Sequence, residues 1–218
     1  MTTRGKAALI LTHNRQDLVL DAVAAIRPQV DTVLVIDNAS NPPVIVPDGV
    51  ELAAIPDQPP NLSRLWNFGL DYFTGLFGEQ PWDAAFLCDD TVAPAGWFDV
   101  VTEAMRTTGA TIGCTNPWGS AQAPVVKRTP DRDIAGRMIG WAFVLDGTSG
   151  LRADENMTFW YLDTDLDFQA RLHGGFVMVG GYPVPNVHPG GYTATGLYNQ
   201  QIDQDRIAFA AKWGSLPW

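Results

Sequence analysis

Three short apolar runs, each ending in polar residues, constrain the fold of this chain more than any other feature. They are residues 7–11, 32–36 and 84–87. Each is a nearly continuous apolar segment of the length expected for a strand buried on both faces of a sheet. Residues 17–26 lie between the first two runs and carry apolar side chains at close to helical spacing, which predicts a βαβ unit. The sequence therefore predicts an α/β fold.

The polar residues that follow these runs are expected to meet at one edge of the sheet. They are residues 12–15 after the first run, residues 37–40 after the second, and Asp89 and Asp90 after the third. Ligands of open α/β sheets bind at the carboxyl ends of the strands. Two adjacent carboxylates in that place need a cation, which favours a metal-bridged phosphate site. The alternative is that the two aspartates only start a turn or cap the next helix.

The remainder of the chain continues the alternation of strands and helices. The patterns predict a strand near 50–55, a helix over 62–76 with Asn61 as its N-cap, a helix over 97–105, strands over 111–115, 137–145 and 176–179, an acidic helix over about 163–171, and a closing helix over 199–213. Residues 116–133 show no clear period and predict a long loop.

Composition limits the class of protein. The 218 residues are 46% hydrophobic and 17% charged, which is typical of a globular chain, and no linker divides them, so we expect a single domain over 1–218. The net charge of −10 disfavours a long phosphodiester footprint. The two cysteines are not at metal-site spacing. Without a signal-peptide pattern or a bilayer-length apolar run, the expected location is cytoplasmic, with no transmembrane segment.

Taken in order, the motifs resemble the GT-A glycosyltransferases. The closest likeness is to the large family-two inverting group that includes the rhamnosyltransferase-like enzymes. The segments that carry it are Thr12-His13-Asn14-Arg15, Asp37-Asn38-Ala39-Ser40, the helix with Asn61, Asn67 and Gly69, Cys88-Asp89-Asp90, Gly140-Trp141-Ala142-Phe143, Asp154-Glu155, Asp165-Leu166-Asp167 with Arg171, His188 with Gly190-Gly191, and Lys212-Trp213-Gly214. The likeness spans about 7–214 and implies a GT-A domain, a Rossmann-like mixed sheet flanked by helices. Residues up to about 115 would form its nucleotide-sugar half, and 116–218 its acceptor half.

The sequence departs from the family pattern in two places. The family often has an acidic residue or asparagine where this chain has Cys88, and its acidic helix often begins Glu-Asp where Thr164 precedes Asp165 here. The register of the catalytic base is therefore less well defined than that of the metal site.

The resemblance implies a divalent cation, Mn²⁺ or Mg²⁺. Asp90 would be the direct ligand, Asp89 would hold the ribose or a metal-bound water, and His188 would complete the coordination shell. Hard carboxylate oxygens suit both ions, and an imidazole favours Mn²⁺. The alternative for His188 is a histidine on a surface loop.

The donor side would be formed by the ends of the first two strands and by the helix after Asn61. By similarity, Asp37 would accept a hydrogen bond from a pyrimidine ring. The other candidate contacts to base, ribose or phosphate are Thr12, Asn14, Arg15, Arg64, Asn67 and Asp89. The alternatives are an Asx-turn at Asp37, a solvated Arg64, and a capping or packing role for Asn67.

An inverting displacement needs one general base to take the proton of the acceptor hydroxyl. Asp165 is favoured by the family pattern, because it lies two residues before Asp167 and six before Arg171. Asp163 is the alternative base. Asp167 is placed to pair with Arg171 one helical turn later.

The predicted function is a metal-dependent inverting glycosyltransferase, a hexosyl- or deoxyhexosyltransferase with a UDP-linked donor. The acceptor would be a glycan, a protein or a small molecule, and a modified nucleic acid stays open. Trp141, Trp160 and Tyr161 are candidates for an aromatic platform under a sugar ring. Two other functions compete: a sugar nucleotidyltransferase, although residues 12–15 are not the Gly-rich basic loop of that class, and a sugar-binding module without catalysis.

Overall fold

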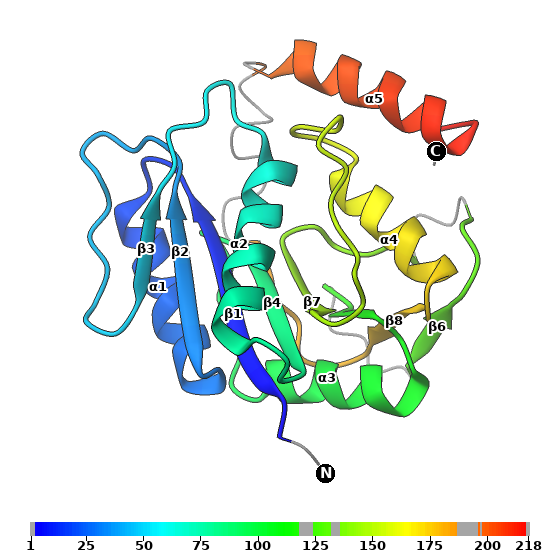
Figure 1. The fold of residues 1–218 in the computed structure, drawn as a ribbon, viewed down its shortest axis with the longest axis horizontal. Helices are drawn as coiled ribbons and strands as arrows, with labels where there is room; N and C mark the ends of the chain where they lie inside the picture. The colour runs from blue at the N-terminus through cyan, green and yellow to red at the C-terminus, as the bar shows by residue number, and fades with distance from the viewer. Residues whose placement is uncertain (1–2, 118–123, 132–135, 187–195, 197, 217–218) are drawn as a thin grey trace.

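A mixed β-sheet forms the centre of the molecule (Figure 1). The computed structural model describes residues 3–117, 124–131, 136–186, 196 and 198–216. The strands are β1 (Gly5–Thr12), β2 (Thr32–Asp37), β3 (Glu51–Ala54), β4 (Trp82–Cys88), β5 (Ile112–Thr115), β6 (Val125–Lys127), β7 (Ala142–Asp146) and β8 (Phe176–Val179). Within the described residues, their order across the sheet is β3-β2-β1-β4-β7-β5-β8-β6. The α/β prediction with a mixed sheet is confirmed.

The first four strands form a parallel half of the sheet. β1 pairs with β2 on one side and with β4 on the other, so that Thr12 is level with Asp37 and Leu11 is level with Cys88. The three apolar runs are the interiors of these strands. The polar residues that follow them therefore leave the sheet at one edge, as the sequence predicts.

β7 interrupts the parallel arrangement. It lies between β4 and β5 and is antiparallel to both, with Phe86 opposite Phe143 and Gly113 opposite Val144. The rings of Phe86 and Phe143 stack with their centroids 4.9 Å apart. β7 therefore joins the two halves of the sheet into one surface.

Helices cover both faces of the sheet. They are α1 (Gln16–Ile26), α2 (Leu62–Phe77), α3 (Trp97–Thr108), α4 (Leu162–Leu172) and α5 (Asn199–Trp213), with a short 3-10 turn η1 (Arg27–Gln29) after α1. Figure 1 shows α1 behind β1 to β3 and α2 in front of β1 and β4. Asn61 caps α2, since its side chain accepts a hydrogen bond from the backbone N–H of Arg64, as predicted. A Cβ at Gly69 would lie 2.6 Å from Leu9 Cδ2, so this glycine permits the close packing of α2 on β1.

Two elements differ from the sequence-based expectation. Residues 116–133 are not entirely a loop, because Val125–Lys127 form β6 on the sheet edge beside β8. β6 has only three residues and two prolines close by, at 124 and 130, so it lacks the length that a periodic pattern needs. The strand expected over 137–145 begins only at Ala142.

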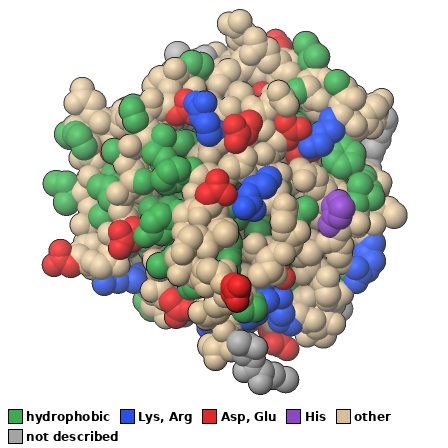
Figure 2. Space-filling model, viewed as in Figure 1, with side chains coloured by type: hydrophobic (Ala, Val, Ile, Leu, Met, Phe, Trp, Pro, Cys, Tyr) green, Lys and Arg blue, Asp and Glu red, His purple; other side chains and the backbone are tan. Residues whose placement is uncertain are grey.

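The surface carries charges of both signs. On the face shown in Figure 2, basic side chains lie next to acidic ones, and green apolar side chains gather on the left of the view. Among the described residues, no helix combines the length and the apolar character that crossing a bilayer requires.

Candidate functional site

The carboxyl ends of β1 and β4 bring four predicted site residues together. The Thr12 hydroxyl donates a hydrogen bond of 2.8 Å to Asp89 Oδ2. Arg15 Nη1 lies 3.0 Å from Asp90 Oδ2 and 3.5 Å from Asp89 Oδ1. Both carboxylates are buried, with 7% of Asp89 and 5% of Asp90 exposed. The two aspartates thus face a cationic side chain at the edge where a ligand is expected.

One oxygen of this cluster has no partner. Asp90 Oδ1 is the buried side-chain oxygen that lacks a hydrogen bond among the described residues. Leaving such a group unsatisfied is costly, and a carboxylate oxygen is the ligand type that Mg²⁺ and Mn²⁺ prefer. The acid pair therefore fits the predicted divalent cation.

The described residues contribute few ligands to that cation. The described residues contain no group of three His, Cys, Asp or Glu side chains arranged as a metal centre. His188, the third predicted ligand, lies outside the described residues. A site with one or two carboxylates is nevertheless typical of ions that are shared with the phosphates of a substrate.

Burial is the largest influence on the pKa values of Asp89 and Cys88. Burial raises the pKa of Asp89 to about 6, and the charge of Asp90 adds to this shift. The hydrogen bond from Thr12 and the charge of Arg15 oppose it. Burial also raises the pKa of the Cys88 thiol far above its usual range, and the charges of Asp90, Asp89 and Asp163 add to that shift. Asp163 is therefore in electrostatic reach of the same strand end.

The loops after β1 and β2 are fastened to each other through Asn14. Its backbone N–H donates to the Ser40 hydroxyl at 2.8 Å, and its Oδ1 accepts the Asn41 N–H at 2.6 Å. Asn14 has a left-handed backbone with φ of 57°. Asn14 and Arg15 also line an open cavity of about 650 Å³ whose other walls are Gln16, Leu20 and residues 41–47. Asn14 thus joins the loops after β1 and β2 beside this cavity.

The Asp37 carboxylate accepts hydrogen bonds from the loop that follows it. Its Oδ1 accepts the Ser40 N–H at 2.9 Å and its Oδ2 accepts the Val44 N–H at 3.1 Å. Only 3% of the residue is exposed. This is the Asx-type arrangement that the sequence left open as the alternative, and recognition of a base by Asp37 stays a prediction.

Arg64 and Asn67 also have protein partners. Arg64 forms an ion pair with Asp57 and remains about half exposed. The Asn67 amide exchanges two hydrogen bonds of 3.0 Å with the backbone of Ala153 and donates a third to Glu155. Asn67 therefore ties α2 to the segment before α4, which is a structural use of the residue.

Asp165 is enclosed by α5. It is fully buried, and its Oδ1 lies 2.8 Å from both Lys212 Nζ and Trp213 Nε1. Gln169 donates to its other oxygen at 2.7 Å. Every side of this carboxylate is thus occupied by a donor from the protein.

Asp163 has a more open environment. It is half-buried, and its Oδ1 accepts the backbone N–H of the neighbouring Thr164 at 2.8 Å. Burial raises its pKa, which the charge of Arg137 opposes. A Cβ at Gly140 would lie 2.6 Å from Asp163 Oδ2, so the glycine leaves room for this carboxylate. Sequence reasoning missed Arg137, because residues 137–145 were assigned to a strand. The one signal for it was its position close to the Gly140 motif.

Asp167 and Arg171 form the predicted ion pair. Arg171 is fully buried, with Nη2 2.6 Å from Asp167 Oδ2 and Nη1 2.9 Å from Asp131 Oδ1. It also donates to the carbonyl oxygens of Thr129 and Gly136. Arg171 therefore fastens the chain that leads to Arg137 onto α4.

The three aromatic candidates are not equivalent. Trp141 Nε1 donates to the Val184 carbonyl at 2.9 Å, and Tyr161 is buried against Phe209. Trp160 is 38% exposed. Among the three, it presents the most free ring surface to a ligand.

Comparison with known proteins gives a likeness at the level of structure. No protein-family profile matches the chain, and no curated protein matches it in sequence. TarS of S. aureus, residues 1–349, superposes with a TM-score of 0.58 at 10% identity, covering 93% of this chain and 69% of TarS. GalNAc-T7 in complex with UDP, GalNAc and Mn²⁺ superposes with a TM-score of 0.62 at 10% identity, covering 85% of this chain.

The fold is that of the GT-A glycosyltransferases, the class to which both of these proteins belong. This confirms the predicted GT-A fold, whereas membership of the family-two group stays a prediction. The chain spans 44% of the length of GalNAc-T7, so the likeness concerns one part of that protein.

Proposed function

We propose that this chain is a metal-dependent, inverting glycosyltransferase that moves a hexosyl or deoxyhexosyl group from a UDP-linked donor to an acceptor hydroxyl. The observation that carries this proposal is the buried acid pair at the end of β4, with the unpartnered Asp90 Oδ1. The UDP, GalNAc and Mn²⁺ bound in GalNAc-T7 support the choice of donor and ion. Residues up to about 115 would serve the donor, and residues 116–218 the acceptor.

The donor side would use the residues at the ends of β1 and β4. Asp90, with Asp89, would hold the ion, which when bound supplies Lewis-acid stabilisation to the departing diphosphate. Thr12 orients Asp89 through its hydrogen bond. Arg15 balances the charge of both carboxylates and would also meet a phosphate held by the ion.

We assign the general base to Asp163 rather than to Asp165. Asp165 is fully buried and held by Lys212, Trp213 and Gln169, so it has no free side for an acceptor. Asp163 is half-buried and within electrostatic reach of Cys88 at the donor end. It would take the acceptor's hydroxyl proton while that oxygen bonds to the anomeric carbon. The bond from that carbon to the phosphate oxygen breaks, and the diphosphate leaves with the electron pair.

Replacing Asp90 by Ala tests the function. We expect the variant to lose Mn²⁺-dependent binding of UDP by about tenfold or more and to lose turnover of UDP-sugars, because a direct ligand is removed. Calorimetry with UDP and Mn²⁺, and release of UDP from a panel of UDP-sugars, measure the two effects. Asp99→Ala is the matched control, since Asp99 is exposed and pairs only with Lys6.

Full activity of Asp90→Ala in the presence of a chelator would refute the proposal. Incubation of the wild type with UTP and a sugar 1-phosphate separates it from the competing enzyme class. Release of pyrophosphate there would identify a nucleotidyltransferase instead.

A further inference from the structure

Asp205 of α5 makes an unusual set of contacts with the chain before α4. Its carboxylate is fully buried and accepts three consecutive backbone N–H groups, from Thr158, Phe159 and Trp160, each at 2.7 Å. Hydrogen bonds to an ionised acceptor are roughly twice as strong as those between neutral groups. One side chain of α5 therefore fixes the backbone of three residues that are about 45 positions away in the sequence.

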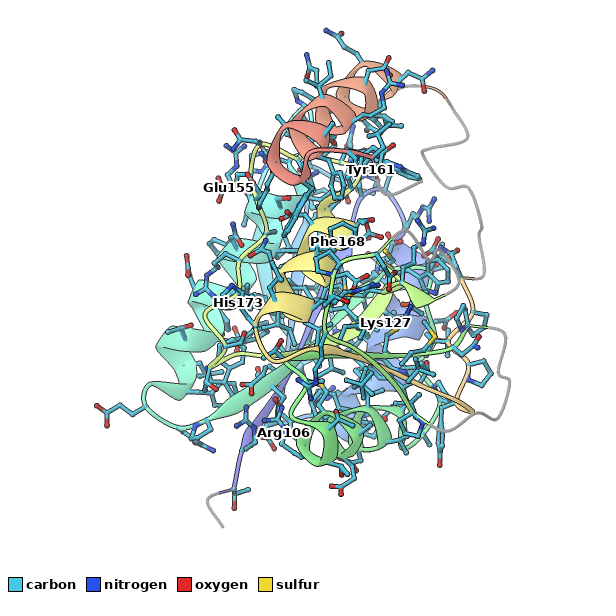
Figure 3. The ribbon with its side chains drawn as sticks, turned by 90° about the vertical axis from the view of Figure 1, so that its right-hand side faces the viewer. Arg106, Lys127, Glu155, Tyr161, Phe168 and His173 are labelled. Carbon is cyan, nitrogen blue, oxygen red and sulfur yellow. The ribbon has the colours of Figure 1, made fainter. Side chains whose placement is uncertain are left out.

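The fixed segment determines how α4 begins. The next residue, Tyr161, has a left-handed backbone with φ of 62°, a strained conformation for a non-glycine residue. Its carbonyl accepts the Asp165 N–H at 2.7 Å in the first turn of α4. Figure 3 shows Tyr161 directly below α5 at the top of α4. The direction of Asp163 thus depends on the residues that Asp205 holds.

Polar contacts hold α5 together with apolar packing, since Phe209 lies against Tyr161 and Phe168. Asp205 and Phe209 are its fully buried residues, and Ile207 is 66% exposed. Gln201 donates to the Pro60 carbonyl at 2.9 Å and to the Thr158 hydroxyl at 3.1 Å, which ties the same helix to the start of α2. A buried carboxylate is therefore an anchor of α5 in addition to its aromatic packing.

The hydrogen bonds from Asp205 also fix the backbone of an exposed aromatic residue, Trp160. Its backbone N–H is bound to Asp205, yet the residue is 38% exposed and lies three positions before Asp163. An exposed indole on a fixed backbone offers a flat apolar surface at low entropic cost, which suits stacking against a sugar ring. The neighbouring carboxylate and the net charge of −10 disfavour an anionic acceptor.

We propose that Asp205 is a positioning residue for the acceptor: it holds residues 158–160 so that Trp160 receives a neutral carbohydrate beside Asp163. This inference rests on the proposed glycosyltransferase function. It makes α5 part of the acceptor site although none of its side chains is assigned to the chemistry.

Fluorine NMR of the fluorotryptophan-labelled protein tests the positioning without any need for activity. Trp160→Phe assigns the Trp160 resonance among the eight tryptophans. We expect Asp205→Asn to shift or broaden that resonance, because the amide group puts its own N–H against the backbone donors. Asp203→Asn is the matched control on the same helix, since Asp203 is exposed and pairs with Arg206. An unmoved Trp160 resonance in a folded Asp205→Asn protein would overturn the inference.

Kinetics tests the role in acceptor binding. With neutral p-nitrophenyl glycosides as acceptors and UDP release as the readout, Asp205→Asn and Trp160→Ala should each raise the acceptor KM by about tenfold. The donor KM should stay within about twofold, and Asp203→Asn should match the wild type. An acceptor KM unchanged in Asp205→Asn contradicts the inference.

The two proposals fail in different ways. A wild type that turns over no UDP-sugar would refute the proposed function. A titration of the Trp160 fluorine resonance with the same glycosides would still show whether Trp160 binds a carbohydrate. If Asp205→Asn does not fold, Asp205→Glu, which keeps the charge on a longer side chain, replaces it in both measurements. We expect it to give a smaller change in the same direction.

Discussion

Asp163 and Asp165 lie two residues apart in the first turn of α4, yet their surroundings give them different uses. Donors from α5 enclose Asp165, whereas Asp163 accepts the N–H of the neighbouring Thr164 and faces Gly140. A sequence motif aligns both carboxylates with a catalytic position. The contacts of each side chain, which come from distant parts of the chain, favour Asp163, which the donors of α5 do not enclose.

The base assignment predicts a specific kinetic loss. Asp163→Asn should lower kcat by about 10²-fold to 10⁴-fold with little change in UDP affinity, because proton transfer is lost while the donor side is intact. Initial rates at saturating donor and the Kd of UDP measure the two quantities. Wild-type turnover in this variant would exclude Asp163 as the base.

The pH profile offers a second reading of the same prediction. Burial raises the pKa of Asp163, so the residue binds a proton at a higher pH than an exposed aspartate, and activity should fall as the pH drops through that raised value. The charge of Arg137 opposes this shift. Arg137→Ala should therefore move the acidic limb of kcat to higher pH.

Gly140 should be sensitive to a single methyl group. A Cβ there would lie 2.6 Å from Asp163 Oδ2 and 2.9 Å from Asp163 Cβ, so Gly140→Ala should displace the carboxylate and lower kcat by about tenfold or more. Gly75→Ala in α2 is the control, because nothing lies within 4 Å of its new Cβ. That control should keep full activity and gain about 0.5–1 kcal/mol in the free energy of unfolding. Equal kcat for the two variants would contradict the prediction.

At the scale of the elements, the parallel half of the sheet was predictable because its signals are local. The interiors of β1, β2 and β4 are continuous apolar runs, and Asn61 caps α2 as its side chain suggested. β6 was not predictable, since three residues on an edge carry no period. α5 was predicted as a helix, but its pattern did not show that Ile207 is exposed and Asp205 buried.

The candidate site also has a part that the sequence could predict and a part that it could not. The meeting of Thr12, Arg15, Asp89 and Asp90 could be predicted, because the register of parallel strands places their ends together. Two other features depend on loops whose paths no periodicity encodes. They are the hydrogen bonds of Asp37 to backbone donors and the effect of the Arg137 charge on Asp163.

At the scale of the whole molecule, a charge cluster lies at the end of the sheet away from the acid pair. Asp83, near the start of β4, pairs with Arg4 at 2.7 Å and with Arg106 at 2.9 Å, and both arginines also contact Asp146. In Figure 3, Arg106 lies at the opposite end of the molecule from Tyr161. The cluster joins the amino end of the chain to α3 and β7.

Asp83→Ala should destabilise the protein without changing its chemistry. The free energy of unfolding should fall by about 1–3 kcal/mol, because two partly exposed arginines lose the buried carboxylate to which they donate hydrogen bonds. Urea denaturation measures this, and activity per folded molecule should be unchanged. Asp71→Ala removes an exposed pair with Arg152 and should cost less than about 0.5 kcal/mol. A loss of kcat in folded Asp83→Ala would show that the two ends of the sheet are coupled.

The place of β7 in the sheet has a consequence for biosynthesis. Because β7 separates β4 from β5, a growing chain that has emerged as far as β5 still lacks the strand that joins its two halves. Until then β4 keeps an open hydrogen-bonding edge beside its apolar neighbours, which is the condition under which nascent chains associate with one another. The emergence of the segment up to Asp146 is thus the step at which this edge of β4 can first be covered.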